Sequence, residues 1–196
     1  MKDAAGALSF TVRDPEGHRL ELVEHPGGGW LRGSGDGSRR ISRRLLHAGI
    51  LVGDLPASTQ FYQDLLGFTE IWRGSRSGTE LSWTNMKPPD GDDYLEFMLY
   101  GDLPAPEARG SQHHICLEVP DVEAARARLL ARPYHASYAR QLEARVGTNR
   151  RRQLNLFDPD GTRVELMEPG TVNGQPVPSS SAPPPRRAAK QISVPD

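Results

Sequence analysis

The 196-residue sequence has a single cysteine, Cys116, no long apolar run and no excess of charge of either sign. One cysteine cannot form a disulfide within the chain, so nothing in the composition argues for an oxidising compartment. No apolar stretch reaches the length that crosses a bilayer, and the first residues lack the apolar core of a signal peptide. A formal net charge of -1 argues against nucleic acid and anionic membranes as partners. By default, these absences predict a cytoplasmic protein.

Glycine, proline and serine are concentrated in two stretches that favour no packed core. Residues 26–44 (PGGGWLRGSGDGSRRISRR) have the composition of a flexible linker rich in Gly, Ser and Arg. Residues 169–196 include the run PVPSSSAPPPRR and predict a disordered tail rich in Pro and Ser. A compact domain is therefore expected between residues 45 and 168.

One phrase occurs twice, as DPEGHRLELVE at residues 14–24 and as DPDGTRVELME at residues 158–168. Asp-Pro-Glu/Asp-Gly is a turn sequence, because Pro presets one dihedral angle and Gly accepts the left-handed conformation that closes the turn. Apolar residues on both sides predict a strand before and a strand after, so each copy predicts a hairpin. The glutamate within each second strand, Glu21 or Glu165, is costly to bury unless a charged group pairs with it.

A second repeat divides the expected domain into halves. HAGILVGDL begins at His47 and HICLEVPDV begins at His114, and in both an aspartate seven residues later precedes a helical pattern. An aspartate at this point is expected to cap the helix. The glutamate-bearing strands YLEFMLY and RVELME follow, one in each half. The spacing predicts an α+β fold in which a β-α-β-β-β module is repeated over residues 45–100 and 112–168.

Strand alternation places a histidine and a glutamate of each module on a face of mixed character, opposite a face that is apolar apart from His113. The apolar faces suit the two helices, so the mixed faces point into a shared cavity. The two histidines lie 67 residues apart and the two glutamates 69. Imidazoles and carboxylates that converge in this way suit a divalent ion such as Zn, Ni, Co, Fe or Mn. The predicted ligands are His47, Glu96, His114 and Glu165, whereas His113 is predicted to be structural or exposed.

The same alternation predicts which other side chains line the cavity. The predicted lining residues are Trp83, Met98, Tyr100, Gln153, Asn155 and Phe157. They suggest a small, partly aromatic substrate with a few polar groups, although Trp83 and Phe157 are equally suited to filling the core.

The stretches LLHAGILVGDLPASTQFYQDLLGF, YLEFML, HHICLEVPDV and DPDGTRVELME resemble the vicinal oxygen chelate superfamily. This superfamily includes glyoxalase I, methylmalonyl-CoA epimerase, fosfomycin-resistance proteins and extradiol dioxygenases. The resemblance implies that the paired modules curl into a half-barrel around one metal ion. The order His47, Glu96, His114, Glu165 is similar to glyoxalase I, whereas dioxygenases and fosfomycin enzymes use only the positions of His47, His114 and Glu165.

The resemblance also implies that residues 1–25 are the last hairpin of a preceding module of the same type. On that interpretation, the sequence is the C-terminal part of a longer protein. The alternative is a hairpin that docks on an edge strand of the domain.

The function implied by the resemblance is a metal-dependent lyase or isomerase of glyoxalase type, in which Glu165 or Glu96 takes a proton beside a carbonyl. Glu165 is favoured as the base because the tight turn before its strand should fix its approach to the ion. Glyoxalase I holds glutathione with an arginine and an asparagine at positions that are Leu51 and Tyr100 here. A small oxygenated substrate that is not linked to glutathione is therefore expected.

Two other functions stay open. An extradiol-type dioxygenase is the second candidate, although the positions of that group's acid–base histidine and tyrosine hold Glu96 and Asn155. A non-catalytic binder similar to bleomycin-resistance proteins is the third, although such proteins do not need four intact ligands. In each case the expected partner is a small molecule, and a homodimer is compatible with the sequence.

Overall fold

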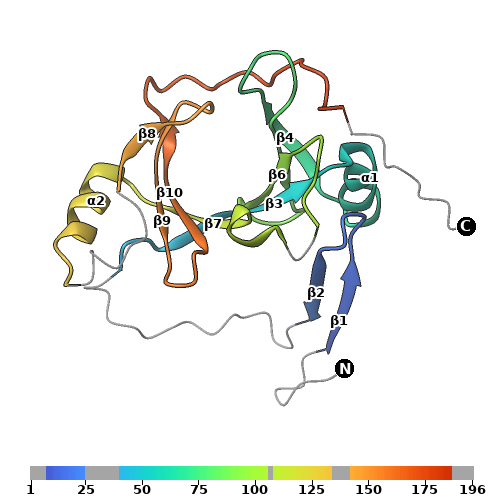
Figure 1. Ribbon diagram of the computed structural model, residues 1–196, viewed down its shortest axis with the longest axis horizontal. Helices are drawn as coiled ribbons and strands as arrows, with labels where there is room; N and C mark the ends of the chain where they lie inside the picture. Colours follow the sequence, from blue (N-terminus) through green and yellow to red (C-terminus); the bar gives the residue numbers. More distant parts are fainter. Residues whose placement is uncertain (1–7, 25–39, 106–107, 134–141, 187–196) are drawn as a thin grey trace, which may run out of the picture.

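Eight strands form one curled, mixed sheet with helices on its outer side (Figure 1). The computed structural model describes residues 8–24, 40–105, 108–133 and 142–186, so the predicted linker up to position 39 lies outside the described residues. The sheet order is β4-β5-β6-β3-β7-β10-β9-β8. This order is symmetrical about the antiparallel pair β3–β7, and β3–β6 and β7–β10 are parallel. The predicted α+β fold of paired modules is therefore confirmed.

Each half of the sheet is one β-α-β-β-β module, and its helix begins at the predicted aspartate. The side chain of Asp54 accepts a hydrogen bond from the N–H of Ala57, and that of Asp121 accepts one from Ala124. The first module contains β3 (Arg44–Val52), α1 (Leu55–Thr59), the π-helical η2 (Gln60–Leu65), β4 (Thr69–Gly74), β5 (Trp83–Lys87) and β6 (Tyr94–Leu99). A short 3-10 helix, η4 (Gly110–Gln112), precedes the second module, which contains β7 (His114–Glu118), α2 (Val122–Leu130), β8 (Ala144–Val146), β9 (Arg151–Phe157) and β10 (Arg163–Thr171).

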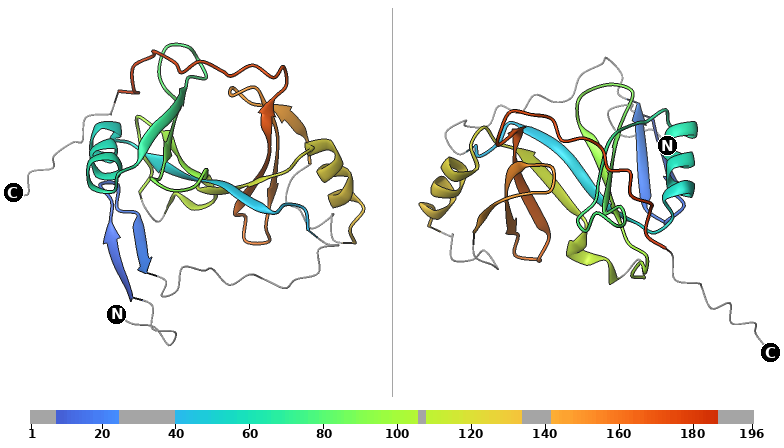
Figure 2. Two further views of the ribbon diagram at one scale, coloured as in Figure 1. Left: turned by 180° about the vertical axis from the view of Figure 1, so that it is seen from behind. Right: turned by 90° about the horizontal axis from the view of Figure 1, so that it is seen from above.

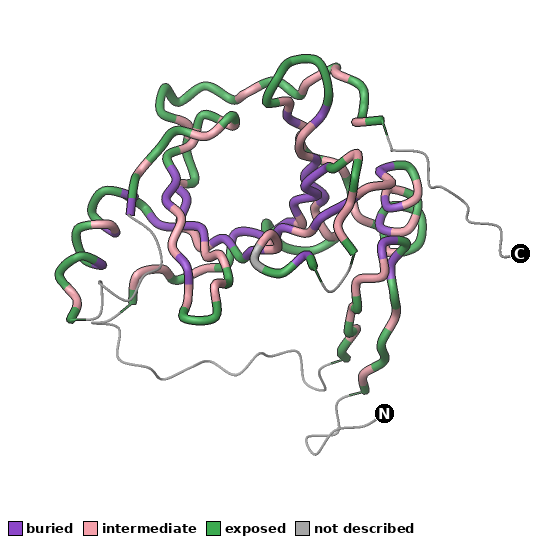
Figure 3. The backbone as a smooth tube through the Cα atoms, in the orientation of Figure 1, coloured by how far each residue is buried: buried purple, intermediate pink, exposed green. Residues whose placement is uncertain are grey.

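Two apolar clusters attach the helices to the outer face of the sheet. Tyr62 and Phe97 belong to the cluster of the first module, and Leu154 and Leu166 to that of the second. All four side chains are buried. Buried residues also follow the strands around the hollow of the sheet (Figure 3). The apolar faces therefore hold the helices, and the mixed faces line the hollow.

The strands β1 (Leu8–Arg13) and β2 (Arg19–Glu24) form a separate hairpin whose turn docks on the first module. The carboxylate of Glu16 accepts hydrogen bonds from the N–H groups of Gly53 at 2.9 Å and Asp54 at 2.5 Å. Asp14 accepts a hydrogen bond of 3.0 Å from the hydroxyl of buried Tyr62. Among the described residues, neither hairpin strand pairs with the eight-stranded sheet. The hairpin thus docks through its turn and not along an edge strand.

An Asp14→Ala variant is expected to lower the free energy of unfolding by about 1–3 kcal/mol, because it leaves the buried Tyr62 hydroxyl without its acceptor. Urea denaturation measures this change. Asp158→Ala is the matched control, since Asp158 accepts the same turn hydrogen bonds in the second copy, from Asp160 and Thr162. Equal losses in the two variants would show that the turn itself, and not its docking on Tyr62, accounts for the effect.

Of the predicted tail rich in Pro and Ser, residues 169–186 are described and follow a defined path, whereas residues 187–196 lie outside the described residues. β10 continues to Thr171, and residues 172–186 then cross the open side of the curled sheet toward β4 (Figures 1 and 2). The N–H of Ser180 donates to the carbonyl of Arg73 at 2.9 Å, and the N–H of Leu81 donates to the carbonyl of Pro183 at 2.8 Å. The physical reason is that β4 is an edge strand with free backbone groups, for which an extended chain is a suitable partner.

Candidate metal centre

Two imidazoles and two carboxylates project from the four central strands into the hollow of the sheet. His47 of β3 and His114 of β7 lie on neighbouring strands, and Glu96 of β6 and Glu165 of β10 lie on the strands that flank them. All four side chains are buried. Gly49 pairs with both His114 and Glu96, and a Cβ atom there would overlap the His114 ring. Glycine therefore leaves the space that this ring occupies.

The geometry of three of these residues suits a single metal ion. The Nε2 atoms of His47 and His114 are 3.0 Å apart, and Oε2 of Glu165 lies 3.5 Å from the first and 3.7 Å from the second. Ligand atoms around an ion with bonds of about 2.1 Å are separated by about 3.0–3.5 Å. His47, His114 and Glu165 thus form a buried group that could hold a metal ion, and the set of donors suits a borderline divalent ion.

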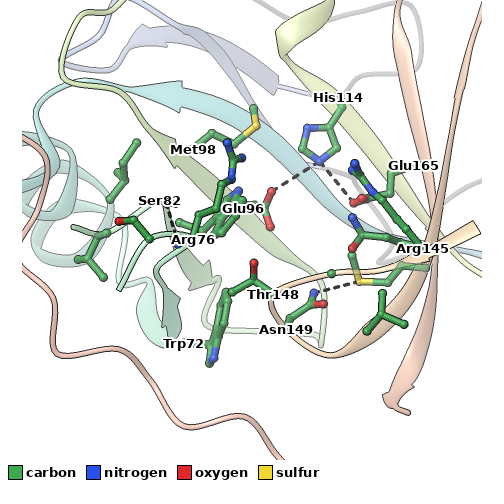
Figure 4. Close-up of a pocket in the computed structure, with 18 of the residues that line it drawn as sticks. Trp72, Arg76, Ser82, Glu96, Met98, His114, Arg145, Thr148, Asn149 and Glu165 are labelled. Atoms are coloured by element: carbon green, nitrogen blue, oxygen red, sulfur yellow. Dashed lines mark hydrogen bonds and ion pairs between the residues drawn. The ribbon is translucent and has the colours of Figure 1, made fainter. Parts of the chain in front are cut away.

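Glu96 lies at the edge of this group. Its Oε1 is 3.7 Å from Nε2 of His114, and its side chain projects toward the same hollow (Figure 4). The compact group of three does not include Glu96. This carboxylate is therefore beside the candidate metal position and outside the compact group.

The two glutamates differ in proton affinity. Burial raises the pKa of Glu96 to about 7, and the nearby charge of Glu165 adds to the effect. Burial alone would also raise the pKa of Glu165, but the contacts with His114 and His47 lower it well below its ordinary value. Burial lowers the pKa of His114, and the charge of Arg163 acts in the same direction. At neutral pH, Glu165 is ionised, His114 is neutral and Glu96 is close to its midpoint.

Metal binding is expected to stabilise the protein more at pH 8 than at pH 6.5. Because the pKa of Glu96 is higher in the folded chain than its ordinary value of 4.5, its protonation stabilises the folded, metal-free protein. This stabilisation is complete at pH values below 4.5 and is lost as the pH rises through about 7. Since a divalent ion favours the ionised form of a carboxylate beside it, metal binding below pH 7 is also coupled to loss of the Glu96 proton. Calorimetry with and without Zn²⁺ should therefore show a larger rise in melting temperature at pH 8. Glu96→Gln should weaken this dependence, and equal rises at both pH values in the natural protein would contradict the reasoning.

His113 faces away from this centre, toward the N-terminal hairpin. Its ring packs edge-on against His18, with ring centroids 5.2 Å apart. Burial lowers the pKa of His113, and the charges of His18 and Arg109 act in the same direction. His113 thus serves as a matched control for His114 in mutagenesis.

A cavity of about 600 Å³ is lined by Glu96, His114 and Glu165, and this volume is enough for a small-molecule substrate. Among the residues predicted to line it, four do so: Trp83, Met98, Tyr100 and Gln153. Asn155 and Phe157 are not part of its lining. Asn155 pairs with Glu165 and Phe157 pairs with Arg163 on β10. The cavity instead lies toward the start of β9, beside Gln153.

Sequence reasoning missed the charged lining of the cavity, which includes Arg76, Arg145 and Arg163. Arg163 stands two residues before Glu165, so strand alternation could have placed it on the inner face. Arg145 pairs with Gln153 across β8 and β9, which is visible only once the strands are aligned. Arg76 lies in the loop between β4 and β5, where no periodic pattern predicts the direction of a side chain.

The expectation about glutathione depended on two positions that the structure now locates. Leu51 is fully buried and outside the cavity lining, whereas Tyr100 lines the cavity. Neither supplies a positive charge, but the three arginines reach the cavity from other elements. The expectation of a substrate that is not linked to glutathione therefore stays a prediction, and the charge of the cavity comes from other positions than these two.

Comparison with known proteins identifies the family. The family model of the glyoxalase/bleomycin resistance protein/dioxygenase superfamily matches residues 44–166, which include both modules and all four residues of the candidate centre. The chain belongs to this superfamily. The uncharacterized protein YaeR of Escherichia coli (strain K12) is 31% identical over 135 residues, which cover 64% of this chain and 96% of YaeR. The uncharacterized protein YwbC of Bacillus subtilis (strain 168) is 26% identical over 128 residues, 65% of this chain and 99% of YwbC.

Solved structures support the same fold. Methylmalonyl-CoA epimerase from Mycobacterium tuberculosis is similar with a TM-score of 0.52 and 23% identity, over 66% of this chain and 90% of the epimerase. The 2,3-dioxygenase LapB from Pseudomonas sp. KL28 is similar with a TM-score of 0.55 and 17% identity, over 87% of this chain and 62% of LapB. At these identities the likeness concerns the fold alone. Among the described residues, every helix is too short or too polar to cross a membrane.

Proposed function

We propose that the protein is a divalent-metal-dependent lyase or isomerase that moves a proton beside a carbonyl of a small oxygenated substrate. One observation carries this proposal: the buried carboxylate of Glu96 lies 3.7 Å from His114, beside a buried group of two histidines and a glutamate that could hold an ion. Burial also raises the pKa of this carboxylate. General bases are most effective when their pKa is close to the working pH. Superfamily membership is compatible with this chemistry, and the residues of this chain supply the reason for preferring it.

In this proposal His47, His114 and Glu165 hold the ion, and Glu96 is the fourth residue of the site. When bound, the ion would supply Lewis acidity that stabilises negative charge on a substrate oxygen. Glu96 accepts the proton at one of its carboxylate oxygens and returns it to the product. The four side chains are themselves buried, which strengthens the electrostatic interactions between them.

The assignment of Glu96 as the base differs from the preference for Glu165 that the sequence suggests. Glu165 contacts both imidazoles, which lower its pKa and make its carboxylate a weak base. Glu96 is 3.7 Å from one imidazole, and burial raises its pKa toward neutrality. The two environments therefore favour Glu165 as a metal ligand and Glu96 as the base.

Extradiol-type oxygen chemistry is the second candidate. The observation that favours it is that the compact group contains two histidines and one carboxylate, the ligand set of many Fe(II) oxygenases. In that case Glu96 would not be needed as a ligand.

Deuterium exchange tests the proposed function. Metal-loaded protein is incubated in D2O with small 2-hydroxy ketones and 2-oxo acids, and NMR follows the hydrogen next to the carbonyl. We expect exchange with the natural protein and none with Glu96→Gln. Oxygen consumption by Fe(II)-loaded protein with catechols, without any exchange, would favour the dioxygenase. Absence of both reactions across the substrate set would favour a non-catalytic binding protein.

A further inference from the structure

The cavity beside the metal centre has more positive than negative charge once an ion is bound. Its charged lining consists of three arginines, the imidazole of His114 and three glutamates. Two of the glutamates are Glu96 and Glu165, whose charges a divalent ion would neutralise. The third, Glu80, is exposed at the rim. Three guanidinium groups then face the cavity with a single carboxylate to balance them.

None of these three guanidinium groups has a salt-bridge partner within the described part of the chain, in contrast to Arg44 and Arg73, which pair with Asp93 and Glu70. Unpaired guanidinium groups that share one cavity are suited to bind a carboxylate or phosphate from outside the protein.

Arg163 lies deepest of the three. Its terminal nitrogen donates to Nδ1 of His114 at 2.5 Å and lies 3.3 Å from the sulfur of Met98, and its Nε is buried without a hydrogen-bond partner. A buried donor without a partner is unfavourable, so a ligand that accepts from it would be stabilised.

The other two arginines approach the cavity from opposite modules. Arg76 follows β4 in the first module, and its guanidinium lies 5.1 Å from the centre of the Trp83 ring. Arg145 belongs to β8 of the second module. Figure 4 shows Arg76 and Arg145 on opposite sides of the pocket, with Glu96 and His114 between them. A ligand that meets the ion is therefore within a cavity that both modules line with positive charge.

We infer that Arg76, Arg145 and Arg163 form an anion subsite beside the metal centre. The inference rests on the proposed function and narrows its substrate class. The substrate then carries a phosphate, phosphonate or carboxylate group a few bonds from the oxygens that meet the ion. Guanidinium groups bind such groups by paired, charge-assisted hydrogen bonds, which give both affinity and orientation. This subsite fixes which carbon of the substrate faces Glu96.

Three hydroxamates that share one chelating pair of oxygens test the subsite. Acetohydroxamate carries no further anionic group, malonohydroxamate adds a carboxylate and phosphonoacetohydroxamate adds a phosphonate. Each is titrated calorimetrically into the Zn²⁺-loaded protein, and the metal content is checked afterwards. We expect at least one anionic hydroxamate to bind about 10–100-fold more tightly than acetohydroxamate, the effect typical of charge-assisted hydrogen bonds. The carboxylate and phosphonate compounds show which anion the subsite prefers.

Variants locate the effect. Arg76→Gln and Arg145→Gln are each expected to reduce the advantage of the preferred anion by about tenfold, while acetohydroxamate binds as before. Arg152→Gln is the matched control, because Arg152 is exposed on β9 and is not part of the cavity lining. The same loss in the control would mean that the general charge of the protein, and not the subsite, attracts the anion.

Two negative results have different meanings. Equal affinities for all three hydroxamates would overturn the anion subsite and leave the metal centre intact. If no hydroxamate binds to the zinc-loaded protein, the proposed function fails, and inorganic phosphate then tests the subsite alone. Phosphate binding that is lost in the Arg76→Gln/Arg145→Gln variant would retain the subsite, and no phosphate binding would overturn it as well.

Discussion

The His47→Ala/His114→Ala variant is expected to bind no divalent ion tightly, whereas the natural protein should bind about one per chain. The double change removes both Nε2 atoms, which lie 3.0 Å apart at the centre of the site. Only Glu165 and Glu96 remain, and two carboxylates in a buried hollow are poor ligands for a borderline ion without imidazole. Elemental analysis after metal reconstitution and removal of loosely bound ions measures the difference.

The neighbouring histidine supplies the control for this experiment. His113→Ala should retain its metal, because the ring of His113 packs against His18 and not in the centre. Circular dichroism of each variant establishes that loss of metal does not follow from loss of fold. Metal content in the double variant equal to that of the natural protein would place the ion elsewhere and remove the basis of the proposed function.

The Glu96→Gln variant is expected to lose turnover by about 10²–10⁴-fold on a true substrate, which is the usual contribution of a general base. The amide keeps the size of the side chain and one oxygen, but it cannot accept the proton. Metal content should fall little, because Glu96 lies outside the compact group of His47, His114 and Glu165. Single-turnover kinetics on metal-loaded protein measures the proton-transfer step.

Glu165→Gln is the matched comparison. It should weaken metal binding strongly, because it removes the carboxylate that contacts both imidazoles. Once saturated with metal, it should retain more activity than Glu96→Gln. The reverse order of activities would exchange the roles of the two glutamates. If both variants keep full activity on a true substrate, proton transfer by these residues is wrong, and oxygen chemistry becomes the leading hypothesis.

The charged lining of the cavity could be predicted only in part from the sequence. Strand alternation predicts that Met98 and Gln153 face inward, and both line the cavity. The same rule applied to the start of β10 would have placed Arg163 with Glu165, but it could not have shown that this guanidinium reaches Nδ1 of His114. That contact depends on how far β7 and β10 are offset, which the register of the folded sheet sets.

The sequence by itself determined the architecture of this protein, namely the duplicated module, the aspartates that begin both helices and the strand faces that carry His47 and His114. These features depend on local rules, since alternation and capping involve residues within a few positions of one another. Only the tertiary structure decided the unequal environments of Glu96 and Glu165, the docking of Asp14 on Tyr62 and the path of residues 172–186 to the edge of β4. The physical reason is that burial, charge and free backbone groups at a given residue are set by neighbours far away in the chain, and these become neighbours only after folding.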